Sequence, residues 1–212
     1  MRRMTSERET LIDELIDTGR EVVTQGLVRA SGGNLSVRLP GDGGFLVTAS
    51  GTWLDRLEPD QLSELSFDGE LLGGAARPSV EWRLHARTYA VRPDVHAIVH
   101  LHPQHVLLVD MLGAPIRFTT LDHQYYLGSA GRIPFLPSGS REVADAAAEA
   151  AREHDAVVLA HHGCSTMGDT MSMALRRALN LEEAATMTYR LLVAGNTSAE
   201  FPPEWKDSIV TV

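Results

Sequence analysis

The chain has 212 residues, a formal net charge of −9 and one cysteine, Cys164. This length fits a single domain, and we expect residues 1–212 to form one unit with a substantial core. The acidic balance argues against a nucleic-acid or anionic-membrane partner, and no apolar run of about 18 residues predicts a membrane span. A lone cysteine excludes an internal disulfide and favours a cytoplasmic location.

Hydrophobic periodicity and turn residues divide the chain into helices and short strands. In chain order we predict a helix at 6–26, strands at 35–39 and 45–49, helices at 59–64 and 79–92, a strand at 96–102, a helix at 105–113, strands at 116–121 and 132–136, a helix at 140–154, a strand at 157–162 and a helix at 171–195. The first strands are joined by turns too short for parallel crossovers. We therefore predict an α/β fold, a three-layer α/β/α sandwich around a central mixed, mostly antiparallel sheet.

Two histidines, His100 and His102, end the apolar segment HAIVHLH. Alternate side chains of a strand point to one face, so both imidazoles can reach a single metal ion. The segment VVLAHHG at 157–163 has the same design. Two such strands would give a three-histidine site with one position open for substrate, which is typical of catalytic zinc. The alternative is a pair of polar side chains at a sheet edge.

Glu81 lies in the first turn of the predicted 79–92 helix, four residues before His85, so the two side chains share a face. A carboxylate at this place ordinarily stabilises the helix dipole. If the helix points at a metal ion, Glu81 becomes a candidate acid–base group. The turns SGGN, TASG and RPSVE offer backbone N–H groups and hydroxyls that could hold an anion.

The basic residues are eighteen arginines and one lysine, Lys206. Carbonyl chemistry through a Schiff base needs a desolvated lysine amine. Lys206 lies in the polar segment FPPEWKDS, which cannot desolvate it. Carbon–carbon bond chemistry in this chain would therefore have to use a metal ion.

Five segments in order, SGGNLSVR, VTASG, RPSVEWRLH, AIVHLH and AHHG, resemble the class II aldolase/adducin family. The pattern is most similar to the L-fuculose-phosphate aldolase branch and covers roughly residues 8–195. The resemblance implies a zinc-dependent lyase, usually a fourfold homotetramer. Such an enzyme cleaves or forms a C–C bond in a small ketose, or a ketose 1-phosphate, through a metal-stabilised enediolate.

The same resemblance implies roles for single residues. Zinc would be bound by His100, His102 and His162, the histidine directly before glycine. His161 would be a neighbour of the metal, and Glu81 takes the place of the family's catalytic glutamate. The residues that fall where such aldolases hold the substrate phosphate are Gly33, Asn34, Ser50, Gly51 and Ser79.

The chain departs from the family pattern at Val80, where these aldolases have a second phosphate-binding serine. The substrate is then either unphosphorylated or held differently. Val80 also replaces the lysine of the sugar-acid-phosphate decarboxylase branch, and Glu81 replaces the aspartate of the ribulose-phosphate epimerase branch; both differences favour the aldolase. The aldolases' tyrosine proton donor has no clean match, which leaves the second acid–base group open among Thr119, Asp122, His123, Tyr125 and Tyr126.

Other roles stay open at this stage. His96 and His105 are expected in the core or behind the site, and residues 196–212 are too irregular to interpret. The three-histidine set also suits Fe²⁺, Mn²⁺ or Co²⁺. The resemblance accordingly extends to sugar-phosphate dehydratases, to iron oxygenases, and to adducin-like assembly modules that have the fold without the chemistry.

Overall fold

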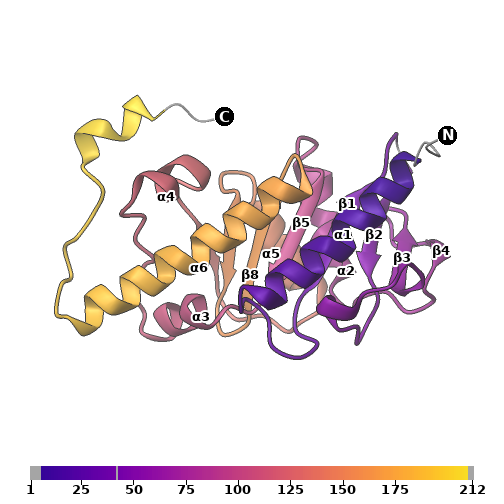
Figure 1. Cartoon of the computed structure of the whole chain (residues 1–212), viewed down its shortest axis with the longest axis horizontal. Coiled ribbons are helices and arrows are strands. Elements are labelled where there is room, and N and C mark those ends of the chain that lie inside the picture. The colour runs from indigo at the N-terminus through magenta and orange to yellow at the C-terminus, as the bar shows by residue number, and fades with distance from the viewer. Residues whose placement is uncertain (1–5, 42, 210–212) are drawn as a thin grey trace.

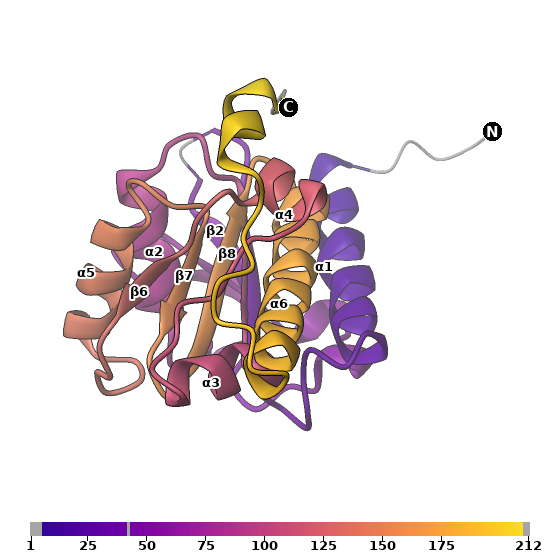
Figure 2. The same cartoon turned by 90° about the vertical axis from the view of Figure 1, so that its left-hand side faces the viewer.

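Helices cover both faces of one central sheet in a computed structural model that describes residues 6–41 and 43–209 (Figures 1 and 2). One layer contains α1 (Glu7–Thr24) and α6 (Met171–Val193). The opposite layer contains α2 (Trp82–Val91) and α5 (Arg141–Ala150), as Figure 2 shows. The predicted α/β/α sandwich is confirmed.

The described strands form an eight-stranded sheet in the order β4-β3-β2-β1-β5-β8-β7-β6. Only the β6–β7 pair is parallel within this sheet, so it is mixed and mostly antiparallel, as predicted. The strands are β1 Asn34–Arg38, β2 Phe45–Thr48, β3 Leu62–Leu65, β4 Leu71–Gly74, β5 Ala97–Leu101, β6 Gly131–Ile133, β7 Ala156–Leu159 and β8 Gly163–Gly168.

Two short helices complete the α1/α6 side, where both contact α6. They are α3 (Gln104–Met111) and α4 (Leu121–Tyr126). Three 3-10 turns lie at Leu54–Arg56, Pro59–Gln61 and Pro203–Ser208. No helix in the described part of the chain combines the length and apolar character needed to cross a membrane.

Several predicted boundaries were wrong. The helix expected at 59–64 is a 3-10 turn that ends at Gln61, because the next residues pair with β2 as strand β3. The strand expected at 116–121 is absent, since the Arg117 N–H donates to the Thr188 hydroxyl of α6 rather than to a neighbouring strand. The helix expected from residue 79 begins at Trp82. Strands β4 and β8 lack apolar alternation and were not predicted.

Strand β1 shows how the two layers divide the side chains. Leu35 and Val37 belong to the apolar cluster beneath α1 and α6. Asn34 and Ser36, which alternate with them, are buried on the α2 side. Because β1 pairs with β5 in a register that places Asn34 opposite His100, polar groups of two strands meet beneath the start of α2.

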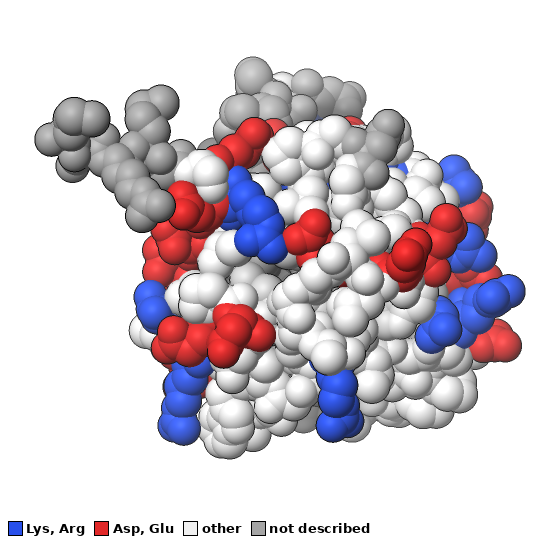
Figure 3. Space-filling model, turned by 90° about the vertical axis from the view of Figure 1, so that its right-hand side faces the viewer, with Lys and Arg blue, Asp and Glu red and all other residues white. Residues whose placement is uncertain are grey.

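Acidic and basic side chains are interspersed on the face of the molecule nearest β4 (Figure 3). The described part of that face shows no continuous basic surface.

Candidate metal centre and active site

Four side chains from three parts of the chain converge at one end of the sheet. Glu81, His100, His102 and His162 each place a ligand atom within 4.8 Å of the ligand atoms of the others. Glu81 directly precedes α2, His100 lies in β5, His102 follows the last residue of β5, and His162 lies in the turn between β7 and β8. The structure thus brings together the three histidines and the glutamate that the resemblance singled out.

The Glu81 carboxylate is the centre of this group and has four polar partners. The His100 Nε2 and the Asn34 Nδ2 lie 3.1 and 3.0 Å from Oε2. The His162 Nε2 and the Ser138 hydroxyl lie 3.1 and 2.9 Å from Oε1. Burial alone would raise the pKa of Glu81, but charge and hydrogen bonds from the histidines outweigh it, so the pKa is held well below its usual range.

A contact on the side away from the cluster orients the His100 imidazole toward the other candidate ligands. The His100 Nδ1 lies 3.1 Å from the Ser165 hydroxyl, which leaves Nε2 facing the cluster. The His102 Nε2 lies 3.3 Å from the His100 Nε2. Burial, with charge from the other two histidines, lowers the pKa of His102 to about 4, so its imidazole is neutral at physiological pH. Neutral imidazole is the metal-binding form.

Two glycines allow the backbone to approach these histidines. A Cβ at Gly163 would lie 2.5 Å from the Cδ2 of His102 and 2.3 Å from the Leu101 carbonyl oxygen. Gly33 has a φ of +79° and a Cβ there would lie 2.6 Å from the His100 carbonyl oxygen. Gly163, which follows His162, is therefore needed because any side chain there would overlap the His102 ring.

The turn that carries His162 is supported by an ion pair on its outer side. His161 has a φ of +57°, an uncommon conformation for a residue with a side chain. Its N–H donates to the buried Asp110 carboxylate at 3.0 Å, and the Arg132 Nε donates to the same carboxylate at 2.7 Å. His161 itself lies outside the cluster, with only His162 directed into it.

A hollow of about 140 Å³ opens beside Glu81 and His102. All five residues expected at a substrate phosphate line it: Gly33, Asn34, Ser50, Gly51 and Ser79. Val80 also lines it, with 62% of its surface exposed. Loop N–H groups and hydroxyls line one side of the hollow, and Glu81 and His102 line the other side. This arrangement suits a small phosphorylated ligand.

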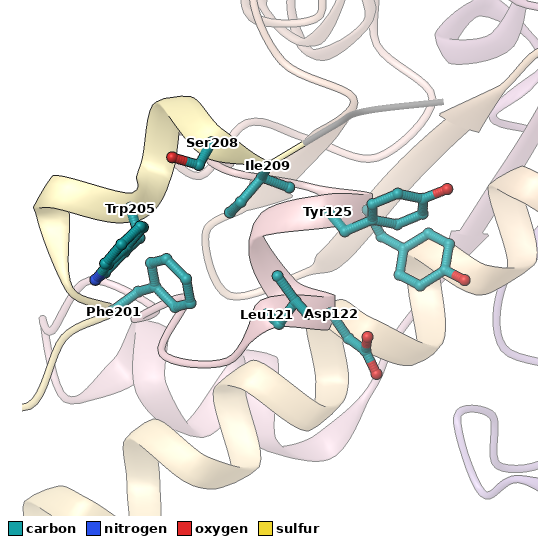
Figure 4. A pocket seen from close by; sticks show the side chains of 8 residues that line it. Leu121, Asp122, Tyr125, Phe201, Trp205, Ser208 and Ile209 are labelled. Atoms are coloured by element: carbon teal, nitrogen blue, oxygen red, sulfur yellow. The ribbon is translucent and has the colours of Figure 1, made fainter.

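The candidates for a second acid–base group lie elsewhere. Asp122, Tyr125 and Tyr126 line a separate hollow of about 490 Å³ between α4 and the C-terminal segment (Figure 4). In Figure 4, Phe201 and Trp205 face α4 across this hollow.

The remaining two candidates, the buried His123 and the half-buried Thr119, also lie outside the hollow beside Glu81. The His123 Nδ1 accepts from the N–H groups of Thr119 and Thr120, and its Nε2 lies 3.6 Å from the Glu183 carboxylate. The Thr119 hydroxyl is buried without a partner in the described part of the chain. His96 and His105 are likewise outside the cluster.

Sequence reasoning missed three supporting residues: Ser138, Ser165 and Asp110. Ser138 lies in the loop before α5, Ser165 in a strand with no apolar alternation, and Asp110 in α3. Each supports the site through a hydrogen bond to a residue more than 20 positions away in the sequence. A single sequence contains no local signal for such contacts. The GCSTMG segment after His162 was the one clue to Ser165, as a polar position two residues beyond the glycine.

Residues 13–189 match the family model for the Class II Aldolase and Adducin N-terminal domain. The chain belongs to this family. It is a metal-dependent lyase of the class II aldolase type, and four of its side chains could hold a metal ion. The predicted family membership is confirmed.

Three similar proteins illustrate the range of the class II aldolase family. The chain is 37% identical to a 5-methylthioribulose-1-phosphate/5-deoxyribulose-1-phosphate aldolase of Rhodospirillum rubrum, over 89% of this chain and 85% of that protein. It is 31% identical to a 3-oxo-tetronate 4-phosphate decarboxylase of Escherichia coli strain K12, over 86% and 88%. The crystal structure of L-fuculose-1-phosphate aldolase from Thermus thermophilus superposes with a TM-score of 0.78 at 33% identity, over 89% of this chain and 98% of that one.

Proposed function

We propose that the protein is a zinc-dependent aldolase that cleaves or forms a C–C bond in a small ketose 1-phosphate. The observation that carries this proposal is the convergence of three imidazoles and a carboxylate beside a hollow lined by N–H groups and hydroxyls. The first substrates to test are 5-deoxyribulose 1-phosphate and 5-methylthioribulose 1-phosphate, which appear in the name of the R. rubrum relative. L-Fuculose 1-phosphate is the next.

The donor set fits a zinc ion. Zinc bonds to imidazole nitrogens at about 2.1 Å in tetrahedral sites, which requires ligand atoms about 3.4 Å apart. The measured separations are 3.3 Å between His100 and His102 and 3.1 Å from Glu81 to His100 and to His162. His100, His102 and His162 would hold the ion, with Glu81 beside it. Fe²⁺, Mn²⁺ and Co²⁺ are the alternatives that imidazole ligands permit.

The bound ion would supply a Lewis acid for the ketose carbonyl and its adjacent hydroxyl. In cleavage the C3–C4 bond breaks, the C4 hydroxyl loses its proton as C4 becomes an aldehyde carbon, and C3 gains a proton. In bond formation the ionised Glu81 carboxylate, which is directed into the site, would remove a proton from C3; in cleavage the protonated carboxyl would return that proton to C3. Asn34 and Ser138 hold that carboxylate in place through N–H and O–H donors.

The phosphate of the substrate would bind in the hollow of Gly33, Asn34, Ser50, Gly51 and Ser79. Val80 supplies an apolar side chain where a serine would add a hydroxyl. We propose that N–H groups of the glycine-containing turns carry most of the phosphate contact in this chain.

The test begins with the metal content of protein purified without added metal or chelator, beside the variant His102→Ala. About one zinc per chain, lost in the variant, is the expected result. A coupled assay for dihydroxyacetone phosphate then follows cleavage of the three ketose 1-phosphates. Stoichiometric iron with consumption of dioxygen would favour an oxygenase, and absence of any metal after reconstitution would overturn the three-histidine site.

The decarboxylase relative at 31% identity favours a second candidate, decarboxylation of an oxo-tetronate phosphate. Val80 weighs against it, since that branch carries a lysine at this position. Release of carbon dioxide from 3-oxo-tetronate 4-phosphate would separate the two reactions.

We also propose a homotetramer, as the resemblance implies, with the second acid–base group supplied from outside this chain's own hollow. None of the five candidate residues lines that hollow within one chain. Light scattering would give the subunit number, and a monomer active on its own would contradict the proposal. The cytoplasmic location stays a prediction.

A further inference from the structure

A ladder of polar side chains runs from Glu81 into the core between β1 and α2. On the strand it uses Asn34 and Ser36, which are two residues apart; on the helix side it uses Glu81, His85 and Tyr89, which are four apart. Two strand residues rise about 6.7 Å and four helical residues about 6 Å, so the two series stay in step along their length. The match places each strand side chain between two consecutive side chains of the helix series.

The contacts of the ladder form one continuous chain of hydrogen bonds. The Asn34 amide bonds to both Glu81 and the His85 Nε2. The Ser36 hydroxyl lies 2.6 Å from the His85 Nδ1 and 2.7 Å from the Tyr89 hydroxyl. All five side chains are buried, with His85 and Ser36 at 0% exposure. The middle of the ladder, at His85 and Ser36, is therefore closed to solvent.

Glu81 determines the direction of every bond in this chain. An ionised carboxylate only accepts, so the Asn34 NH₂ must donate to it and the Asn34 carbonyl oxygen must accept from His85. His85 then carries its proton on Nε2 and accepts at Nδ1 from the Ser36 hydroxyl. The Tyr89 hydroxyl is left to donate to Ser36. Burial lowers the pKa of His85 to about 3, which agrees with a neutral imidazole.

The far end of the ladder is fixed in the core. The centroids of the Tyr89 and Phe45 rings are 5.5 Å apart. The Cζ atom of Arg38 lies 4.8 Å from the centroid of the Tyr89 ring. Arg38 Nη2 also donates to the Tyr89 carbonyl oxygen at 2.8 Å. The hydrogen-bond chain thus connects a rigid aromatic cluster to the carboxylate of the site.

We propose that His85 is a positioning residue for Glu81: it acts through Asn34 and keeps the Asn34 NH₂, rather than its carbonyl oxygen, facing the Glu81 carboxylate. A rotated amide would present an oxygen to the carboxylate and displace it. This role rests on the proposed lyase function and adds a residue that does not touch the metal-binding group. Asn34 then serves the carboxylate as well as the hollow for the substrate.

The test compares His85→Leu, which removes the donor, with His85→Gln, whose amide can again place an N–H near Asn34. The control is Thr88→Val on the same helix, because the buried Thr88 hydroxyl donates to the Leu84 carbonyl oxygen, outside the ladder. We expect His85→Leu to lower kcat about 10- to 100-fold with KM little changed and metal content intact. His85→Gln should recover most of the loss, and Thr88→Val should retain wild-type kcat.

A second measurement needs no substrate and no variant. Imidazole ¹⁵N NMR of the wild-type protein should show His85 as the neutral tautomer protonated on Nε2. A proton on Nδ1, or unchanged kcat in a folded His85→Leu variant, would overturn the positioning role. If the wild-type protein cleaves no ketose phosphate, the proposed function fails, while the tautomer still decides whether the ladder has the inferred polarity.

Discussion

The two sides of strand β1 are both buried but are built for different purposes. Leu35 and Val37 pack into the apolar cluster beneath α1 and α6. Asn34 and Ser36, on the other side, join the hydrogen-bond chain that leads to Glu81. The contrast shows that one short strand can supply the core and the site together, because its period of two separates the two sets of side chains completely.

The largest expected effect comes from the polar side. Glu81→Gln should lower kcat by about 10²- to 10⁴-fold, since the amide cannot carry the proton, while the free energy of unfolding changes little. Turnover of a ketose 1-phosphate and urea unfolding measure the two quantities separately. Wild-type turnover in this variant would exclude Glu81 from proton transfer.

The apolar side should behave in the opposite way. Leu35→Ala removes a fully buried side chain, so we expect the free energy of unfolding to fall by about 2–5 kcal/mol. Turnover per folded molecule should stay close to wild type at a temperature where the variant is folded. A loss of turnover as large as that of Glu81→Gln would mean that the two sides of β1 cannot be separated.

Acid should destabilise the protein through the polar side. His85 has a pKa of about 3 when folded and an ordinary histidine pKa of about 6.5 when unfolded, so the unfolded state binds the extra proton between these values. Stability should therefore fall as the pH falls from about 6.5 to 3, by up to about 1.4 kcal/mol per pH unit. Urea midpoints of metal-free protein between pH 7 and 4 measure this slope. The slope should decrease in His85→Gln and persist in Thr88→Val.

The smallest effect is expected at Ser138. Its hydroxyl donates to Glu81 beside the Asn34 amide, and it lies at the exposed end of the group. Ser138→Ala should cost about 1 kcal/mol in transition-state stabilisation, a several-fold fall in kcat/KM, with metal retained. Loss of metal in this variant would show instead that Ser138 holds the site together.

Much of this protein can be determined from its sequence, because strand and helix periods are local. The spacing of His100 and His102 predicted that these two imidazoles share a face, whereas the choice of His162 over His161 came from the resemblance to the family. The residues of the ladder also follow local periods: Asn34 and Ser36 are two residues apart, and Glu81, His85 and Tyr89 are four residues apart. Neither series reveals its partner until β1 and α2 lie against each other.

Only the tertiary structure decided the rest. Ser138 and Asp110 reach the site across large separations in the chain, where no local pattern marks them. The segment at 116–121 has the composition of a strand but bonds to α6, because the sheet already ends at β6. Spacing along a strand and the family pattern identified the candidate ligands in the sequence, whereas the residues that support them are set by contacts that exist only once the layers have packed.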